Sequence, residues 1–313
     1  MIQTAQKYAI GNAHGKLILV GEHSVVYGMP AIALPFPLLE VASAVEGSYE
    51  QIMFISEYYE GPLSGIPKKL QGIATCIYET LEYLNQPAKG LLIRLHSSIP
   101  IGRGLGSSAA IAIAIVKSLF AYYGQKAKPK ELMSLVHTAE KFAHGNPSGI
   151  DMAAAFSQFP IWFQKGKTES LQIGGPLFLV VADTGNFSDT HGAVSSVRDK
   201  VLAEPEMTQK ALNMLGAITL EAREALYDGD MKLLGELFNS AQSGLIDLGV
   251  SNGDINRLID VARKAGALGA KLTGAGRGGC IIALAHNLAN AKAIAKSLMK
   301  AGALNTWYFS VES

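Results

Sequence analysis

The chain has 313 residues, of which 49% are apolar and 17% charged, enough for the core of one large domain or two ordinary ones. Its formal net charge is +1, which argues against a nucleic-acid-binding protein because such proteins usually carry a basic excess. Two cysteines, Cys76 and Cys280, are too few for a disulfide framework and lack zinc-site spacing, so we expect a reduced, cytoplasmic protein.

The first half of the chain alternates strand-like and helix-like stretches. Strands are expected at 16–20, after Pro30 and at 91–97, with a helix between 67 and 86 whose apolar residues recur at helical spacing. A helix should follow the glycine-rich stretch 102–108, capped by Ser107 or Ser108 and closed by Gly124. Further helices are expected from Pro129 through Glu140 toward Gly145, and from Ile150.

The second half begins with strands at 160–164 and 177–183 on either side of a turn at Gly174–Gly175. We place a domain boundary at this turn, which gives domains 1–175 and 176–313. Helices are expected from 191 to 245, strands on both sides of a glycine loop within 269–285, a helix at 289–301 and a last strand at 306–311. Because strands and helices mix without regular alternation, the sequence predicts an α+β fold. We find neither a signal peptide nor an apolar run approaching the ~18 residues of a membrane span, so no membrane association is expected.

The strongest motif is PIGRGLGSSAA, residues 100–110. Glycines at 102, 104 and 106 remove the β-carbons that would block a ligand, so backbone N–H groups can converge on phosphate oxygens. The helix that follows adds unpaired N–H groups and the positive end of its dipole. A glycine-rich turn with serine caps is the alternative interpretation. The stretch is not a Walker loop, because GxxxxGK[ST] is absent.

Two further motifs carry charged side chains. Residues 15–28, GKLILVGEHSVVYG, place Lys16 at one end of a strand and Glu22 and His23 at the other. A buried strand explains LILV, but two polar residues at the following turn favour a substrate-binding role. Residues 139–151, AEKFAHGNPSGID, place Glu140 near a helix end and Asp151 after a Gly/Pro break. Phosphoryl transfer needs one carboxylate on magnesium and one beside the attacking hydroxyl, although Asp151 fits a helix cap equally well on sequence alone.

A fourth stretch, KLTGAGRGGC at 271–280, matches GxGxxG through Gly274, Gly276 and Gly279. A dinucleotide-binding fingerprint needs a helix directly after it, whereas the residues that follow here, CIIALA, are strand-like. A glycine loop that closes over a ligand from the second domain is therefore the better interpretation.

Together and in this order, the stretches 15–28, 100–110 and 271–280 resemble the GHMP kinases over almost the whole chain. The resemblance implies a two-domain α+β fold with the active site in the cleft between the domains. It also implies transfer of phosphate from ATP, with Mg²⁺, to the hydroxyl of a small molecule. Ser24–Tyr27 differ from the Asp-Tyr that follows GEH in sugar kinases, and 144–151 is typical of members that phosphorylate a small branched hydroxy acid.

The resemblance also carries residue roles. Asp151 takes the place of the catalytic aspartate and Lys16 that of its neighbouring lysine, while Ser108 and Glu140 match the magnesium ligands. The ATP-binding positions are Pro100, Gly102, Arg103, Gly104, Leu105, Gly106, Ser107 and Ser108. The substrate-side positions are Glu22, His23, Thr190 and Gly276. Since His191 stands where some relatives have arginine, the resemblance supplies no anchor for a substrate carboxylate.

Three other interpretations remain open. One is a kinase of the same family whose acceptor is a sugar or an already phosphorylated acid. Another is a ligand sensor that binds ATP but no longer catalyses, although the presence of Lys16, Glu140 and Asp151 favours an enzyme. The last is a structural or interaction protein, which would leave three glycine loops without a reason. Homodimers are common among similar enzymes, and the resemblance permits one here.

Overall fold

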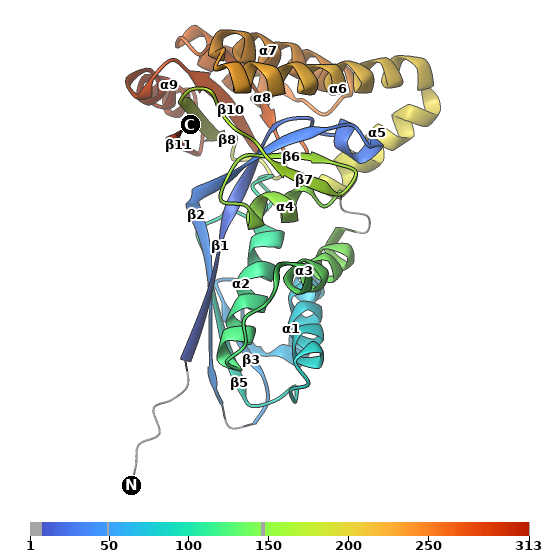
Figure 1. The fold of residues 1–313 in the computed structure, drawn as a ribbon, viewed down its shortest axis with the longest axis vertical. Coiled ribbons are helices and arrows are strands. Elements are labelled where there is room, and N and C mark those ends of the chain that lie inside the picture. The colour runs from blue at the N-terminus through green and yellow to red at the C-terminus, as the bar shows by residue number, and fades with distance from the viewer. Residues whose placement is uncertain (1–7, 49, 145–147, 313) are drawn as a thin grey trace. The chain divides into compact units, whose positions relative to one another are not determined.

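The computed structural model describes residues 8–48, 50–144 and 148–312, and it is drawn in Figure 1. Its strands are β1 (Tyr8–Val20), β2 (Ala31–Gly47), β3 (Met53–Ser56), β4 (Tyr59–Pro62), β5 (Leu91–Ser97), β6 (Ile161–Gln164), β7 (Lys167–Ser170), β8 (Leu177–Asp183), β9 (Gly269–Thr273), β10 (Cys280–Ala285) and β11 (Asn305–Val311). Its α-helices are α1 (Gln71–Tyr83), α2 (Ser107–Tyr122), α3 (Pro129–His144), α4 (Ile150–Phe156), α5 (Thr190–Ala203), α6 (Pro205–Asp228), α7 (Met231–Asp247), α8 (Gly253–Lys264) and α9 (Leu288–Lys300). Short 3-10 turns are η1 (Ser24–Tyr27), η2 (Leu63–Gly65) and η3 (Lys68–Leu70).

The chain forms two compact units that interleave along the sequence. The first unit consists of Met1–Gly15, Phe36–Pro100 and Gly106–Phe156. The second consists of Lys16–Pro35, Ile101–Leu105 and Ser157–Ser313. The glycine-rich loop therefore passes from the second unit to the first between Leu105 and Gly106. The predicted division into domains 1–175 and 176–313 stays a prediction.

In the first unit the sheet order is β4-β3-β5-β2, with β3 parallel to β5 and β2 antiparallel to it. Helices α1, α2 and α3 pack against one another beside this sheet (Figure 1). Gly11 allows β1 to approach α2 closely, because a β-carbon there would lie 2.2 Å from the carbonyl oxygen of Ala114. The core of this unit is thus built from the apolar faces of the sheet and of α2, which is buried along most of its length.

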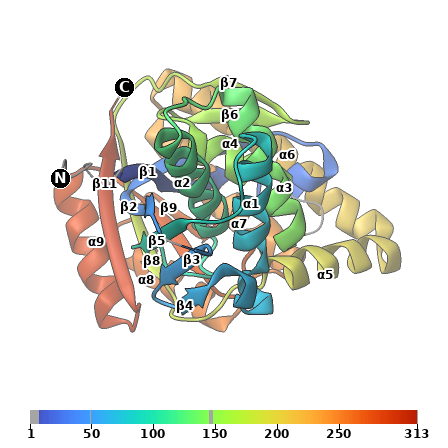
Figure 2. The same ribbon diagram turned by 90° about the horizontal axis from the view of Figure 1, so that it is seen from below.

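The second unit has a four-stranded antiparallel sheet in the order β11-β8-β10-β9. Its register sets Cys280, at the start of β10, opposite Asp183 on β8 and Thr273 on β9. Helix α9 lies along β11 and β8 (Figure 2), while α7 packs on β9 and on α6. The first residues of β2 pair with β6, which continues into a hairpin with β7. This register fixes the position of the loop between β9 and β10.

The expected α+β fold is confirmed, and β5, α3 and α4 begin where the sequence predicts. The predicted serine cap of α2 is wrong. Its N-cap is Gly106, with a left-handed backbone and no side-chain hydrogen bond within the described part of the chain. Strand β1 also begins earlier than expected, at Tyr8, while β7 and α8 are additional elements. The expected break at 146–149 begins with two residues, Asn146 and Pro147, that lie outside the described ranges.

Both cysteines are buried and unpaired with each other. Burial raises the pKa of Cys76 to about 12, which makes its thiol unreactive. None of the helices within the described ranges combines the length and the apolar character that a bilayer crossing requires.

Candidate active site

The glycine-rich loop owes its shape to left-handed backbone at Gly102, Gly104 and Gly106, with φ of 66°, 74° and 77°. A β-carbon at Gly102 would lie 2.0 Å from the ring of Phe187, and one at Gly104 would lie 3.2 Å from the carbonyl oxygen of Thr273. The prediction that glycine opens these two positions to a ligand stays a prediction, because these contacts are with the protein itself. Glycine is required here by the backbone conformation and by packing within the second unit.

Four contacts within the second unit hold the first half of this loop. The Ser188 N–H donates to the carbonyl oxygen of Gly102 at 2.8 Å. The Arg103 guanidinium forms an ion pair with Asp183, and its Nη2 donates to the Gly185 carbonyl oxygen at 3.0 Å. The Lys16 N–H donates to the carbonyl oxygen of the buried Leu105 at 3.0 Å. The loop is thus tied to β8 and β1 as well as to the glycine loop that follows β9.

The second half of the loop opens α2 in the first unit. The Ser107 Oγ is buried and has no hydrogen-bond partner among the described residues, while Ser108 is half-buried on the same first turn. A buried hydroxyl without a partner is costly unless a ligand satisfies it. Helix α2 packs against both α3, which carries the buried Glu140, and α4, whose first turn carries Asp151. The first unit thus supplies two hydroxyls and two carboxylates from helices in mutual contact.

Lys16 lies on β1 and is almost fully buried, with 1% of its surface exposed. Its Nζ donates to the carbonyl oxygen of Gly104 at 3.0 Å. Two residues further on, the Ile18 N–H donates to Thr273 Oγ1 at 3.1 Å, and that hydroxyl donates back to the Ile18 carbonyl oxygen at 2.9 Å. The second unit therefore holds the Lys16 side chain against the glycine-rich loop.

Glu22 is fully buried and forms an ion pair with Lys271 on β9. Burial raises the pKa of the Glu22 carboxyl, and the positive charges of Lys271 and, less strongly, Lys16 oppose that rise. Burial likewise lowers the pKa of Lys271, opposed by Glu22. The second carboxylate oxygen, Oε2, has no hydrogen-bond partner within the described ranges. Glu22 therefore retains an acceptor for a further donor.

His23 occupies a strained turn, with φ 61° and ψ −47°. The Ser24 N–H donates to the Glu22 carbonyl oxygen at 2.7 Å, which closes a γ-turn centred on His23, a rare conformation for a residue with a side chain. The ring Nε2 lies 2.9 Å from the carbonyl oxygen of Ala275. Such strain persists only where neighbouring contacts impose it, and here Lys271 and Ala275 hold both sides of the turn.

The charge state of His23 follows from its surroundings. Burial lowers its pKa to about 4, the hydrogen bond to Ala275 opposes this, and the nearby Arg277 adds to it. The ring is therefore neutral near pH 7. Because a carbonyl oxygen only accepts, the hydrogen lies on Nε2 and leaves Nδ1 as an acceptor. His23 can accept a hydrogen bond from a hydroxyl, but it offers no positive charge to a carboxylate at neutral pH.

The remaining predicted positions differ in exposure. Pro100 is half-buried before the loop, and Thr190 is exposed at the first position of α5. Gly276 is buried with φ 77°, and a β-carbon there would lie 2.2 Å from the Val250 carbonyl oxygen. The Ser188 Oγ donates to the Gly276 carbonyl oxygen at 2.6 Å. As predicted, β10 follows this glycine loop, so the nucleotide fingerprint of a βαβ unit is absent.

The second unit therefore holds Lys16, Glu22, His23, Gly276 and the residues 101–105, while the first holds the serines, Glu140 and Asp151. Sequence reasoning missed Lys271, Asp183 and Thr273, whose contacts join segments more than 75 residues apart. A lysine in the stretch GAKLT and an aspartate at the end of the apolar stretch LFLVVAD were the available signals. No group of three or more histidine, cysteine, aspartate or glutamate side chains within the described ranges is arranged to bind a metal.

The chain belongs to the GHMP kinases, a family of ATP-dependent phosphotransferases. Residues 72–158 match the model of the GHMP kinase N-terminal domain and residues 222–304 that of the C-terminal domain. The mevalonate kinase of Thermococcus sibiricus is 36% identical over 303 residues, covering 88% of this chain and 89% of that protein. The mevalonate kinase of Aeropyrum pernix is 35% identical over 294 residues, covering 89% of each. The resemblance given by the three motifs is thereby confirmed.

Solved structures agree with this assignment. The L. major mevalonate kinase in complex with R-mevalonate has a TM-score of 0.83 at 27% identity, covering 99% of this chain and 96% of that one. The Staphylococcus aureus mevalonate kinase has a TM-score of 0.75 at 30% identity, covering 98% and 100%. The Streptococcus pneumoniae phosphomevalonate kinase, at 18% identity and a TM-score of 0.81, shares the fold.

Proposed function

We propose that the chain transfers the γ-phosphate of ATP to the 5-hydroxyl of mevalonate, giving 5-phosphomevalonate and ADP in the mevalonate route to isoprenoids. The observation that supports it most is the start of α2. Three left-handed glycines precede a helix N-terminus that lacks a side-chain cap and carries the buried, unsatisfied Ser107 Oγ among the described residues. Such a terminus binds anions. The mevalonate kinases among the relatives supply the acceptor.

The residues 100–108 would hold the ATP phosphates through backbone N–H groups and the serine hydroxyls. Lys16, beside the Gly104 carbonyl, would stabilise the negative charge of the transferring phosphoryl group. Glu22 and His23 would face mevalonate, with the His23 Nδ1 accepting from one of its hydroxyls. Thr190 and Gly276 complete the proposed substrate side.

Asp151 is proposed as the base that accepts the proton of the 5-hydroxyl. The hydroxyl oxygen then forms a bond to the γ-phosphorus, the bond from that phosphorus to the bridging oxygen breaks, and ADP leaves with the electron pair. Asp151 lies in the first turn of α4, a helix that packs against α2. Positioning and electrostatics supply most of the acceleration in such reactions, since the transition state is loose.

Magnesium is proposed at Ser108 and Glu140. A serine hydroxyl and a carboxylate are the oxygen ligands that Mg²⁺ prefers together with substrate phosphates, so the donor set fits. When bound, the ion would neutralise charge on the β- and γ-phosphates. A homodimer, which the family resemblance permits, stays a prediction.

The test couples ADP release to a spectroscopic readout with ATP and Mg²⁺. Mevalonate, phosphomevalonate, galactose and homoserine are compared as acceptors, with Asp151→Asn as the matched inactive control. Rapid ADP release with mevalonate alone is expected. Release with another acceptor would keep the phosphoryl chemistry but overturn the substrate. No release from a folded protein that still binds ATP would overturn the enzymatic proposal.

A further inference from the structure

Lys271 is a fully buried lysine to which none of the motifs gives a role. Its Nζ donates to Glu22 Oε1 and to the Leu272 carbonyl oxygen, the latter at 2.6 Å, and lies 6.0 Å from the centroid of the Phe238 ring. Both members of the ion pair have 0% of their side chains exposed. Because burying a lysine is costly, its presence on a strand that is buried at every residue needs a reason.

The position of β9 is fixed by side chains from α7. The Gln242 Oε1 accepts from the Leu272 N–H at 3.0 Å, and the Asn239 Oδ1 accepts from the Ala270 N–H at 3.2 Å. These two amides bond the edge strand on either side of Lys271. The backbone on both sides of Lys271 is therefore held in place, which restricts where its ammonium group can lie.

Lys271 and Lys16 stand near one carboxylate. The Thr273 hydroxyl bonds the backbone of Ile18, which joins β9 to β1. Lys271 lies two residues before Thr273 on β9, and Lys16 lies two residues before Ile18 on β1. Because side chains alternate along a strand, each lysine lies on the same face of its strand as the residue that makes this contact. The charge of Lys16 also acts on Glu22, since it lowers the pKa of that carboxyl. Two buried ammonium groups thus compete for Glu22. Lys271 forms the ion pair, whereas Lys16 donates to the Gly104 carbonyl oxygen.

We propose that Lys271 is a positioning residue for phosphoryl transfer: by pairing with Glu22, it keeps that carboxylate from drawing Lys16 away from the glycine-rich loop. A buried carboxylate without a counter-ion attracts the nearest cation strongly, because the surroundings screen it little. Without Lys271, Lys16 is the remaining cation whose charge is seen to act on Glu22. The inference rests on the proposed role of Lys16 in the reaction.

A purely structural role for Lys271 would make a different prediction. Glu22 is the first residue of the γ-turn centred on His23. Because Lys271 pairs with Glu22, it also stabilises that turn. If this were its whole contribution, removing Glu22 as well would leave the turn equally unsupported and would restore nothing. If Lys271 instead neutralises Glu22, replacing Glu22 by its neutral amide removes the charge that captures Lys16. The double variant therefore separates the two explanations.

The experiment compares kcat and both KM values for Lys271→Met, Glu22→Gln and the double variant, with the exposed Lys296→Met on α9 as control. Lys271→Met should lower kcat about 100-fold, the usual cost of a misplaced catalytic group. The double variant should recover at least about tenfold of that loss, since its amide no longer attracts Lys16. A double variant no faster than Lys271→Met, with both melting as the wild type does, would overturn the proposal.

Lys271→Gln covers the case in which Lys271→Met does not fold, because its amide still donates to Glu22 but carries no charge. The same loss of kcat is expected. A crystal structure of either variant gives a readout that needs no turnover: the Lys16 Nζ should have left the Gly104 carbonyl oxygen for Glu22. Lys16 still on Gly104 would contradict the inference even if the wild type phosphorylated no acceptor. Inactivity of the wild type towards every acceptor would instead contradict the proposed function.

Discussion

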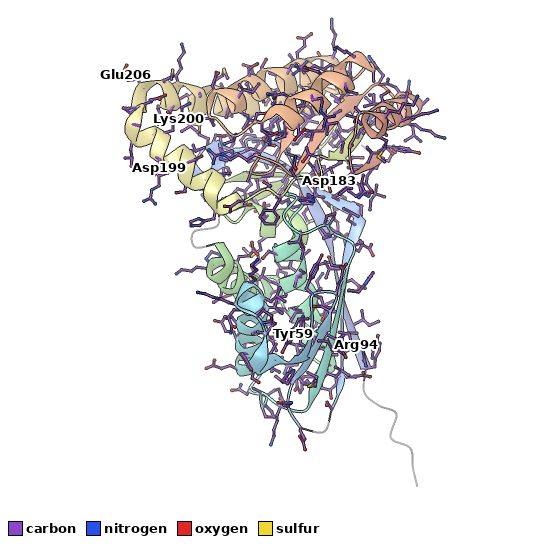
Figure 3. All side chains as sticks on the ribbon, turned by 180° about the vertical axis from the view of Figure 1, so that it is seen from behind. Tyr59, Arg94, Asp183, Asp199, Lys200 and Glu206 are labelled. Atoms are coloured by element: carbon purple, nitrogen blue, oxygen red, sulfur yellow. The ribbon has the colours of Figure 1, made fainter. Side chains whose placement is uncertain are left out.

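Arg103, in the middle of the glycine-rich loop, is paired with Asp183 at the end of β8, the residue labelled in Figure 3. Its Nε lies 2.9 Å from Oδ1 and 3.0 Å from Oδ2, and Oδ1 also accepts from the Gly185 N–H at 2.8 Å. Asp183 is fully buried. The guanidinium of Arg103 therefore holds the loop in place through Asp183 and Gly185.

Asp183→Asn should raise the KM for ATP about tenfold while changing kcat much less. The change keeps the shape of the side chain but removes the charge, and hydrogen bonds to charged groups contribute about 1.5–3 kcal/mol. Part of that stabilisation orders the loop before ATP binds. Steady-state kinetics with Glu169→Gln as control, which breaks an exposed pair with Arg223, measure the effect. An unchanged KM for ATP would exclude a role for the pair in loop order.

Asp151→Asn should lower kcat by about 10²–10⁴, the usual contribution of a general base. ATP binding should stay as in the wild type, because the amide keeps the shape of the carboxylate. Isothermal titration with ATP and a thermal melt show that the variant is folded and competent to bind. Turnover within a few-fold of the wild type would remove Asp151 from the role of base.

Ser108→Ala should raise the Mg²⁺ concentration needed for half-maximal rate and leave the KM for mevalonate unchanged. The hydroxyl is proposed as a direct ligand, so its loss removes one of the few protein oxygens on the ion. Ser107→Ala, one residue earlier, is the matched comparison and should weaken ATP binding without changing the metal requirement. A change confined to mevalonate affinity in Ser108→Ala would show that the metal assignment is wrong.

The lowered pKa of His23 makes stability depend on pH. The folded state keeps the ring neutral down to about pH 4, whereas the unfolded chain protonates near the ordinary 6.5. Protons therefore favour the unfolded state in this window, and stability falls as pH decreases from 6.5 to 4. The full difference corresponds to about 3 kcal/mol, of which about 2 kcal/mol is lost by pH 5.

His23→Asn should remove this slope, since asparagine tolerates a left-handed backbone and does not titrate. Urea unfolding at pH 7.5 and pH 5 measures it, with the exposed His286→Asn as control. The raised pKa of Glu22 acts in the opposite direction, so only the difference between wild type and variant isolates the histidine. Equal slopes in the two proteins would mean that folding does not lower the pKa of His23.

Local patterns predicted the elements whose signals lie within a few residues. Pro129 and Ile150 begin helices, and β5 has the predicted bounds. The cap of α2 was missed because the N-cap position falls on Gly106, whose left-handed backbone belongs to the conformation of the whole loop. Ser107 is therefore the first residue of the helix and not its cap. The residues 8–15 gave only a weak alternation, and their strand is completed by pairing with β2 and by the approach of Gly11 to α2.

The candidate site shows the same division. The glycine positions could be predicted because left-handed backbone favours glycine. The packing of the Phe187 ring against Gly102 could not be predicted, because the two residues are far apart in the sequence. Lys271 and Asp183 acquire their partners only when distant strands meet. The γ-turn at His23 has no local signal, because contacts from the segment 271–275 impose it on an unfavourable residue.

The hydrogen bonds between Ile18 and Thr273 close a loop of 255 residues in the chain. A ribosome makes Ile18 long before Thr273, although other partners of the segment Lys16–Pro35, such as Leu105 and β6, are made in between. The hydrogen bonds of Ile18 to Thr273 must therefore wait, and such distant closure slows folding. Catalytic competence should therefore appear late and abruptly during refolding, after the helical signal, when β9 reaches β1.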